Sequence, residues 1–374
     1  GGGGGGTERR PWRRPEDRGQ RKWVTEQQQT QRRWAAADVF KGLRPQGAAA
    51  VACQSVVCPS AMGGEEEFGA TYELLEELGR GTYGIVQRAR HVPTGQLRAV
   101  KRVRRREAAA TAEEVAVAAE GSSPSSAIAH IDVELEALAS FQHQNVVGFF
   151  EYYSTAEELF VVQELCEGVP LEAFLERARG GCGAGRETAA VVRQMLEAVQ
   201  HCHERGFVHR DLKADNFVFA AEGPVPGTDL KLIDFGLAKR CSHDQRLQGR
   251  AGTVDYSSPE SLRDDAGFGQ PADIWALGAI FFLLITGEPL IKVHQPSANP
   301  SDELKRALQG EAAQKVLDAK YIRLRVASAS SRIPSAAADL LEGLLQQDPA
   351  LRITAEEALR HPWILANASP KKVQ

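Results

Sequence analysis

A glycine-rich stretch near the start of the ordered-looking part of the chain has the composition of a phosphate-binding loop. Residues 79–84 read Gly-Arg-Gly-Thr-Tyr-Gly, and glycines at this spacing let a hairpin backbone approach phosphates that any Cβ atom would obstruct. The same spacing occurs in dinucleotide sites, but there a helix follows it, whereas here a strand pattern follows. The next strand pattern contains Lys101, which could supply a point charge to the phosphates.

A second group of chemically capable residues lies between positions 209 and 236. The run His209-Arg210-Asp211-Leu212-Lys213-Ala214-Asp215-Asn216 combines a carboxylate, a cation two residues later and a carboxamide five residues later. Asp234-Phe235-Gly236 begins 18 residues after Asn216, beyond two short strand patterns. In this order and spacing, the glycine loop, the strand lysine and these two runs resemble the signature set of eukaryotic protein kinases.

This resemblance extends from about Tyr72 to Ile364 and implies roles for individual residues. Asp211 would orient the substrate hydroxyl and accept its proton, and Lys213 would neutralise the moving γ-phosphoryl group. Asn216 and Asp234 would hold two Mg²⁺ ions against the phosphates of ATP. Catalysis would then depend mainly on positioning and electrostatics.

The resemblance also implies an ATP site. The phosphates would lie under Gly79, Arg80, Gly81, Thr82, Tyr83 and Gly84 and near Lys101. The adenine would be enclosed by Val86 and Ala99 above, Val218 below and Gln163 at the back, with the backbone of Glu164 and Cys166 at its edge. The ion-pair partner of Lys101 would be Glu134; Glu136 is the alternative, but two residues further along a helix it faces elsewhere.

The elements needed to position these residues are visible as local patterns. Short apolar or β-branched runs predict strands at 72–78, 85–91, 97–103, 146–153 and 159–165, with a helix at 131–141. After Gly168 the chain is mostly helical, with predicted helices at 171–178, 187–204, 271–286, 302–309, 335–346 and 354–360 and short strands at 217–220 and 230–233. The predicted fold class is therefore α+β and bilobal, with a β-rich small lobe (72–164) and a helical large lobe (168–364).

Three further matches concern the large lobe. Asp273 resembles the central-helix aspartate that caps the catalytic loop, and Thr253 would hydrogen-bond towards Asp211 and Lys213, which favours serine/threonine specificity. Arg352 would reach Glu260 in a buried structural pair. Residues 216–233 and 355–364 resemble the calcium/calmodulin-dependent group, and within it most closely the calcium-dependent kinases of plants and protists.

Composition limits the partners. The chain is 43% hydrophobic and 25% charged, and its net charge of −4 hides a basic leader, with 11 Lys/Arg and 5 Asp/Glu in residues 1–50. Residues 1–68 are predicted to be a disordered tail, solvated rather than bound to nucleic acid or lipid, and 365–374 a short second tail. The longest apolar run, Ile274–Ile285, has 12 residues, too few for a membrane span.

The remaining predictions concern location and regulation. Six scattered cysteines without a CxxC pair are typical of a reduced, intracellular protein, cytoplasmic or also nuclear. No calcium-binding loop pattern occurs, so any regulation by calcium or calmodulin is not encoded in these residues. The expected partners are proteins with Ser/Thr acceptors; Asp215 keeps an acid for a basic upstream residue, although Gly168-Val169-Pro170 lacks the acid usual in this group.

Two alternatives remain beside an active protein kinase. A pseudokinase scaffold would typically lack Lys101, Asp211 or Asp234, and all three are present. A small-molecule phosphotransferase would not need the substrate-floor motif at 252–260. In the 27 residues from Asp234 to Glu260, Gly249 occupies the usual position of the activating phosphate acceptor, so activity is predicted not to require phosphorylation there.

Overall fold

Alternating apolar residues build a five-stranded antiparallel sheet in the first part of the protein. The computed structural model describes residues 64–81, 84–104, 133, 135–155, 157–178, 181–221, 223, 228–242, 245–249, 252–263, 267–292 and 302–368. The strands are β1 (Tyr72–Gly81), β2 (Gly84–His91), β3 (Leu97–Arg104), β4 (Phe149–Ser154) and β5 (Glu158–Gln163), in the order β1-β2-β3-β5-β4. The glycine-rich stretch is therefore the turn between two paired strands, as expected.

A short helix that sequence analysis assigned to the tail covers one face of this sheet. Helix α2 (Glu65–Thr71) places Phe68 against Phe160, with ring centroids 4.3 Å apart, and against Tyr72 and Tyr153. The predicted tail boundary at residue 68 was wrong for this reason: one buried aromatic ring fastens the segment to the sheet. Residues 1–63 and 105–132 lie outside the described residues.

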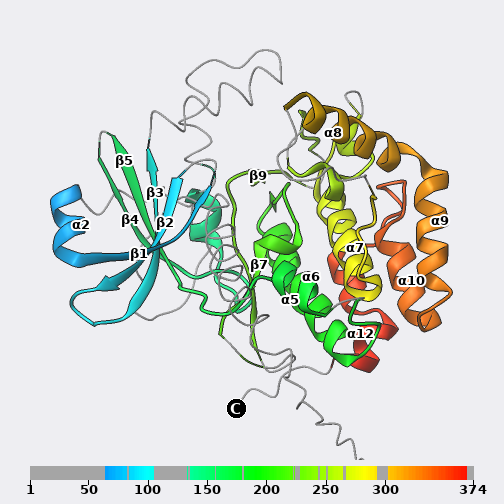
Figure 1. Ribbon diagram of the computed structural model, residues 1–374, viewed down its shortest axis with the longest axis horizontal. Coiled ribbons are helices and arrows are strands. Elements are labelled where there is room, and N and C mark those ends of the chain that lie inside the picture. Colours follow the sequence, from blue (N-terminus) through cyan, green and yellow to red (C-terminus); the bar gives the residue numbers. More distant parts are fainter. Residues whose placement is uncertain are drawn as a thin grey trace, which may run out of the picture.

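Helices form the second part of the protein, to the right of the five-stranded sheet in Figure 1. They are α5 (Leu171–Arg177), α6 (Arg186–Glu204), α7 (Gln270–Thr286), α8 (Asp302–Leu317), α9 (Ala319–Ser330), α10 (Ser335–Leu344), α11 (Ala355–Leu359) and α12 (Pro362–Asn367). Helix α7 is apolar on nearly every side, and Trp275, Ile280 and Phe281 are buried, which is typical of a central core helix. The predicted α+β bilobal fold is confirmed.

Two small strand pairs lie between the sheet and the helices. Strand β6 (Phe207–Val208) pairs with β9 (Lys239–Arg240), and β7 (Phe217–Phe219) pairs with β8 (Leu230–Leu232). Between β6 and β7 runs the segment 209–216, which ends in a 3₁₀ turn (Ala214–Asn216). The residues in 209–216 that could carry out chemistry thus lie in a loop that follows one paired strand and leads into another.

Candidate active site

The backbone of the loop 209–216 is held by one buried carboxylate. Asp273, in the first turn of α7, accepts hydrogen bonds from the backbone N–H of His209 at 2.8 Å and of Arg210 at 3.0 Å, and it contacts His203 Nε2 at 2.8 Å. Burial alone would raise the pKa of Asp273, but these hydrogen bonds and the nearby histidines hold it below its ordinary value. The expected capping role of Asp273 is present, and His203 is an additional partner that the sequence did not identify.

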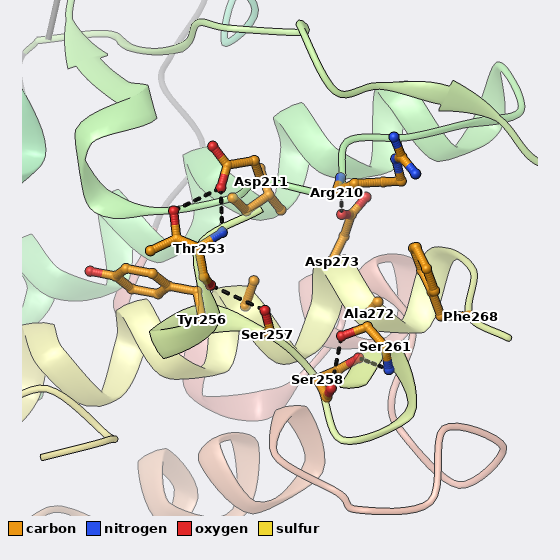
Figure 2. Close-up of a pocket in the computed structure, with 12 residues that line it drawn as sticks. Arg210, Asp211, Thr253, Tyr256, Ser257, Ser258, Ser261, Phe268, Ala272 and Asp273 are labelled. Atoms are coloured by element: carbon orange, nitrogen blue, oxygen red, sulfur yellow. Dashed lines mark hydrogen bonds between the residues drawn. The ribbon is translucent and has the colours of Figure 1, made fainter. Parts of the chain in front are cut away.

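Asp211 lies at the centre of a polar network at the loop surface. Its Oδ1 accepts hydrogen bonds from the backbone N–H and the hydroxyl of Thr253, both at 2.9 Å, and its Oδ2 accepts one from Lys213 Nζ at 2.7 Å. Burial acts to lower the pKa of Lys213, but the Asp211 carboxylate outweighs it and holds the pKa above the usual value. Figure 2 shows Thr253 beneath the Asp211 carboxylate, so the predicted link between these residues is observed.

Asn216 and Asp234 offer oxygen atoms suited to a hard cation. Asn216 is fully buried; its Nδ2 donates to the Asp211 carbonyl at 2.8 Å, while its Oδ1 has no hydrogen-bond partner among the described residues. Asp234 is 5% exposed, and its Oδ1 accepts from the Gly236 N–H at 3.1 Å. A buried amide oxygen left without a partner and a buried carboxylate both suit Mg²⁺, which prefers oxygen ligands.

Backbone strain is concentrated in the same region. Among non-glycine residues of the described chain, only Arg210 and Asp234 have positive φ, 68° and 66°. Left-handed conformations cost energy for residues with a Cβ, and they cluster at functional sites. Both residues flank the proposed chemistry, one directly before Asp211 and one at the predicted metal ligand.

The residues assigned to the nucleotide pocket lie on the strands β2, β3 and β5 of the sheet and on β7. Val86 is paired with Lys101 across β2 and β3, Ala99 is paired with Gln163 across β3 and β5, and Val218 is fully buried. A Cβ on Gly84 would lie 2.1 Å from the Arg102 carbonyl oxygen. Position 84 therefore needs a glycine because the backbone of β3 approaches it too closely for any side chain. Gly79 is buried; the side chain of Arg80 and the residues Thr82 and Tyr83 lie outside the described part of the chain.

The back and edge of the pocket are polar. Gln163 is 8% exposed, and its Nε2 has no partner among the described residues. The Glu164 carboxylate is used structurally, since its Oε2 accepts from Lys231 Nζ at 2.8 Å and from the Gly148 N–H at 2.9 Å. The backbone N–H of Glu164 donates to the Gly148 carbonyl. Burial raises the pKa of the Cys166 thiol to about 12, which keeps this cysteine neutral.

The structure describes one member, Lys101, of the predicted Lys101–Glu134 ion pair. The Lys101 side chain is buried at 3% exposure in β3, while Glu134 lies outside the described residues. The alternative, Glu136, forms an ion pair with Arg240 of β9. Glu136 therefore does face elsewhere, as the helical spacing predicted.

Two structural contacts support the site, and the second, between Arg352 and Glu260, is the one predicted from the sequence. The His209 and Phe235 rings lie 5.1 Å apart, and Leu138 is fully buried in the same hydrophobic cluster as Phe235. Arg352 donates to both oxygens of Glu260, at 2.6 and 3.0 Å, with the two side chains 0% and 4% exposed. These contacts place the substrate-floor motif and the catalytic loop in one packed unit.

A small cavity of about 20 Å³ lies beneath the catalytic loop, large enough for one water molecule. Its lining joins the loop, the substrate-floor motif and α7 (Figure 2). Ser257 Oγ donates to the Thr253 carbonyl at 3.1 Å, and Ser258 is 1% exposed. Ser257 and Ser258 thus hold the floor together, consistent with their assignment to the substrate floor rather than to an activating site.

The bilobal α+β fold and the hydrogen-bonded group of Asp211, Thr253 and Lys213 define the class of protein expected from the sequence, a phosphotransferase. Comparison with known proteins agrees: residues 72–364 match the family model described as protein kinase domain. The chain belongs to the protein kinase family.

Individual relatives narrow the class further. The chain is 31% identical over 295 residues to sperm motility kinase 3A of Mus musculus, covering 79% of this chain and 50% of that protein. It is 32% identical over 303 residues to calcium/calmodulin-dependent protein kinase type II subunit delta of Oryctolagus cuniculus, covering 81% and 50%. It is 30% identical over 299 residues to calcium-dependent protein kinase 14 of Arabidopsis thaliana, covering 80% and 50%.

The expected resemblance to the serine/threonine kinases of the calcium/calmodulin-dependent group is confirmed by these relatives. The plant calcium-dependent kinase is one of several relatives at similar identity. The chain spans about half the length of these proteins.

Proposed function

We propose that this protein transfers the γ-phosphoryl group of ATP, together with Mg²⁺, to serine or threonine hydroxyls of protein substrates. The observation that carries the proposal is the Asp211 carboxylate, whose two oxygens are held by Thr253 and Lys213 at 2.7–2.9 Å. A fixed carboxylate beside a fixed ammonium group can orient a hydroxyl and compensate the charge that moves during transfer.

The chain's own residues divide the work of the reaction. Asp211 accepts the proton of the acceptor hydroxyl as the new O–P bond forms and the bond to ADP breaks. Lys213, whose raised pKa keeps it cationic, interacts with the transferred phosphoryl oxygens. Thr253 restricts the rotation of Asp211 and lies where a short Ser or Thr side chain would approach.

Asn216 and Asp234 are the residues that would hold Mg²⁺. When bound, the metal offsets negative charge on the phosphate oxygens. Their proposed roles are supported by burial, by the partnerless Oδ1 of Asn216 and by the hydrogen bond that fixes Asn216 Nδ2 to the catalytic loop.

The substrates we propose are proteins with Ser/Thr acceptors, favoured by a basic residue upstream that would meet Asp215. Nucleic acid is not expected as a partner, and the proposed location is intracellular, in the cytoplasm, with the nucleus as the alternative. Regulation by calcium or calmodulin would depend on partners or segments other than the described residues. In that part of the chain, no helix is both long and apolar enough to cross a bilayer.

A pseudokinase function is the second candidate, and one observation weighs against it. Asp211 accepts a hydrogen bond of 2.7 Å from Lys213, Asp234 accepts one of 3.1 Å from the Gly236 N–H, and Lys101 is buried in β3. A scaffold that only binds nucleotide has no need of the fixed Asp211–Thr253–Lys213 geometry.

The proposal is tested with labelled ATP and a generic basic protein, with Mg²⁺ and calcium varied. Asp211→Asn should lower the rate by about 10²–10⁴-fold, because the carboxamide keeps a hydrogen-bond acceptor but cannot take the proton. A matched control is Asp318→Asn, which changes the N-cap of α9 far along the chain, where Asn caps as well as Asp. If wild type and Asp211→Asn transfer phosphate equally, or neither does, the proposed activity is wrong.

A further inference from the structure

An ion pair joins the small-lobe helical segment to the strand that follows Asp234-Phe235-Gly236. Arg240 Nε donates to Glu136 Oε2 at 2.7 Å, and its terminal nitrogen contacts the other carboxylate oxygen, so the pair is bidentate. The two residues are 104 positions apart. Bidentate guanidinium–carboxylate pairs have the most restricted geometry of all ion pairs in proteins, so this contact constrains orientation as well as distance.

Arg240 is fixed by the same strands that hold the catalytic loop. In the β6–β9 pair, Arg240 lies opposite Phe207, and its guanidinium group lies 5.0 Å from the centre of the Phe207 ring. Strand β6 continues directly into His209 and Asp211. The Arg240 guanidinium group therefore has a fixed position relative to residues 209–216.

The helical segment 135–140 has apolar contacts on two sides. Leu135 belongs to the cluster under the sheet, with Val103 and Val161, whereas Leu138 belongs to the large cluster that includes Phe235. Apolar contacts of this kind fix the distance of a helix from its neighbours, but they allow it to slide and rotate.

Polar contacts hold the end of this segment. Arg205 Nε donates to the Ser140 carbonyl at 2.8 Å, and the Gln142 N–H donates to His201 Nε2 at 3.1 Å. Among the described residues, Glu136 is the polar contact to the large lobe nearest the start of the segment. With the two ends fixed, rotation of the segment about its own axis is restricted.

We propose that Glu136 and Arg240 are positioning residues that set the rotation of this helical segment relative to the catalytic loop. The inference rests on the proposed function. All side chains of a helix turn together, so fixing the direction of position 136 also fixes that of Leu138, which lies in the same buried cluster as Phe235, next to Asp234.

The pair also supplies a link that does not need a phosphate. The chain has Gly249 at the usual position of an activating acceptor, and Arg240 reaches the helical segment with a permanent charge from the same activation segment. An arginine and a glutamate already in contact hold the segment whether or not the activation segment is phosphorylated.

The test is a double-mutant cycle of Glu136→Gln, Arg240→Gln and the combination, with the charge-reversed pair Glu136→Arg and Arg240→Glu. Each single variant should lower kcat/KM for ATP by about 2- to 5-fold, because an exposed pair can shift the position of the segment by no more than its own interaction free energy. The combination should be no worse than the singles, and the charge-reversed pair should recover part of the loss. Glu73→Gln, which removes the exposed Arg90–Glu73 pair between β1 and β2, is the matched control and should act like wild type.

Two readouts separate positioning from plain stability. The thermal midpoint should change little, because Arg240 is 51% exposed and exposed pairs contribute little to stability. Amide hydrogen exchange across 135–140 should become faster in both single variants and return towards wild type in the charge-reversed pair.

The outcomes that overturn the inference are distinct from those that overturn the proposed function. Wild-type kinetics and exchange in both single variants would contradict the positioning role, as would strictly additive effects in the cycle. An inactive wild-type protein would contradict the proposed function, and the exchange data alone would then decide whether the pair holds the segment.

Discussion

Asp211 and Asp273 are two aspartates of this site with different roles. Asp273 is 1% exposed, and its two oxygens accept the backbone N–H groups of His209 and Arg210. Asp211 also accepts one backbone N–H, from Thr253, but its other partners among the described residues are the side chains of Thr253 and Lys213. The same residue type thus serves structure where it holds the loop backbone and chemistry where it lies beside an ammonium group. Burial also lowers the pKa of His209, so this ring stays neutral beside Phe235.

Asn216→Ala should raise the Mg²⁺ concentration needed for half-maximal phosphate transfer by about 10–100-fold, because it deletes the partnerless Oδ1 that we assign to the metal. A magnesium titration of the transfer rate measures this shift. Asn367→Ala is the control, since that amide donates to the Trp363 carbonyl in α12. An unchanged magnesium requirement in Asn216→Ala would remove Asn216 from the metal site.

His201 makes stability depend on pH. Burial, with smaller effects of Arg205 and His143, lowers the pKa of His201 to about 4 from the ordinary histidine value of 6.5. Below about pH 6.5 the unfolded chain takes up a proton that the folded chain refuses, so the free energy of unfolding falls as the pH falls from 6.5 towards 4.

His201→Gln should flatten this pH dependence, since glutamine can still accept from the Gln142 N–H but has no proton to gain. Urea unfolding at several pH values across that window gives the slope. Equal slopes for the variant and the wild type would show that His201 is not the group responsible.

At the scale of elements, the buried Arg352–Glu260 ion pair holds a short segment that has little local stability. The 3₁₀ turn at Glu260–Leu262 is only three residues long, and Arg352 holds it through Glu260 and through the Pro271 carbonyl at 2.6 Å. The Arg352 guanidinium also lies 5.2 Å from the Trp275 ring. The floor motif, the start of α7 and the segment before α11 thereby form one unit.

Arg352→Met should destabilise the protein by about 3–5 kcal/mol, because it leaves the Glu260 carboxylate buried without its partner. Chemical denaturation measures the change. Arg360→Met is the matched control: it removes the Arg360–Glu356 pair, whose side chains are 74% and 57% exposed, and should cost less than about 1 kcal/mol. Similar losses for both variants would contradict the role assigned to burial.

Some elements were visible in the sequence and others were not. Helices α6 and α7 follow clear apolar patterns and lie close to the predicted 187–204 and 271–286. Helix α9 was missed, because only Ile322, Val326 and Ala329 of its twelve residues are buried. Helix α2 was missed because Phe68 is its one buried residue, and a single aromatic has no periodicity.

At the scale of the whole molecule, the activation segment is held by backbone contacts. The Cys241 N–H donates to the Gly206 carbonyl at 2.8 Å, and Leu247 is bridged to Phe268 by two backbone hydrogen bonds of 2.8 and 3.0 Å. Leu247 and Cys241 are buried together with Val208. These contacts attach the segment to the large lobe independently of any modification.

Ser242→Ala should therefore leave the transfer rate within about twofold of wild type, as expected for an exposed residue away from the packed contacts. Phosphatase treatment of the wild-type protein before the assay should have equally little effect. Loss of activity in either experiment would show that the segment needs a phosphate after all.

The amino-acid sequence by itself determined the class of chemistry, because that depends on residue types at short spacings: the glycine loop, residues 209–216, Asp234 and the strand patterns that carry them. Tertiary structure decided which distant residues meet. Glu136 meets Arg240, His203 meets Asp273, and Phe68 meets Phe160, pairs separated by 104, 70 and 92 positions. Such contacts have no local pattern, since they depend on how the sheet and the helices pack against each other.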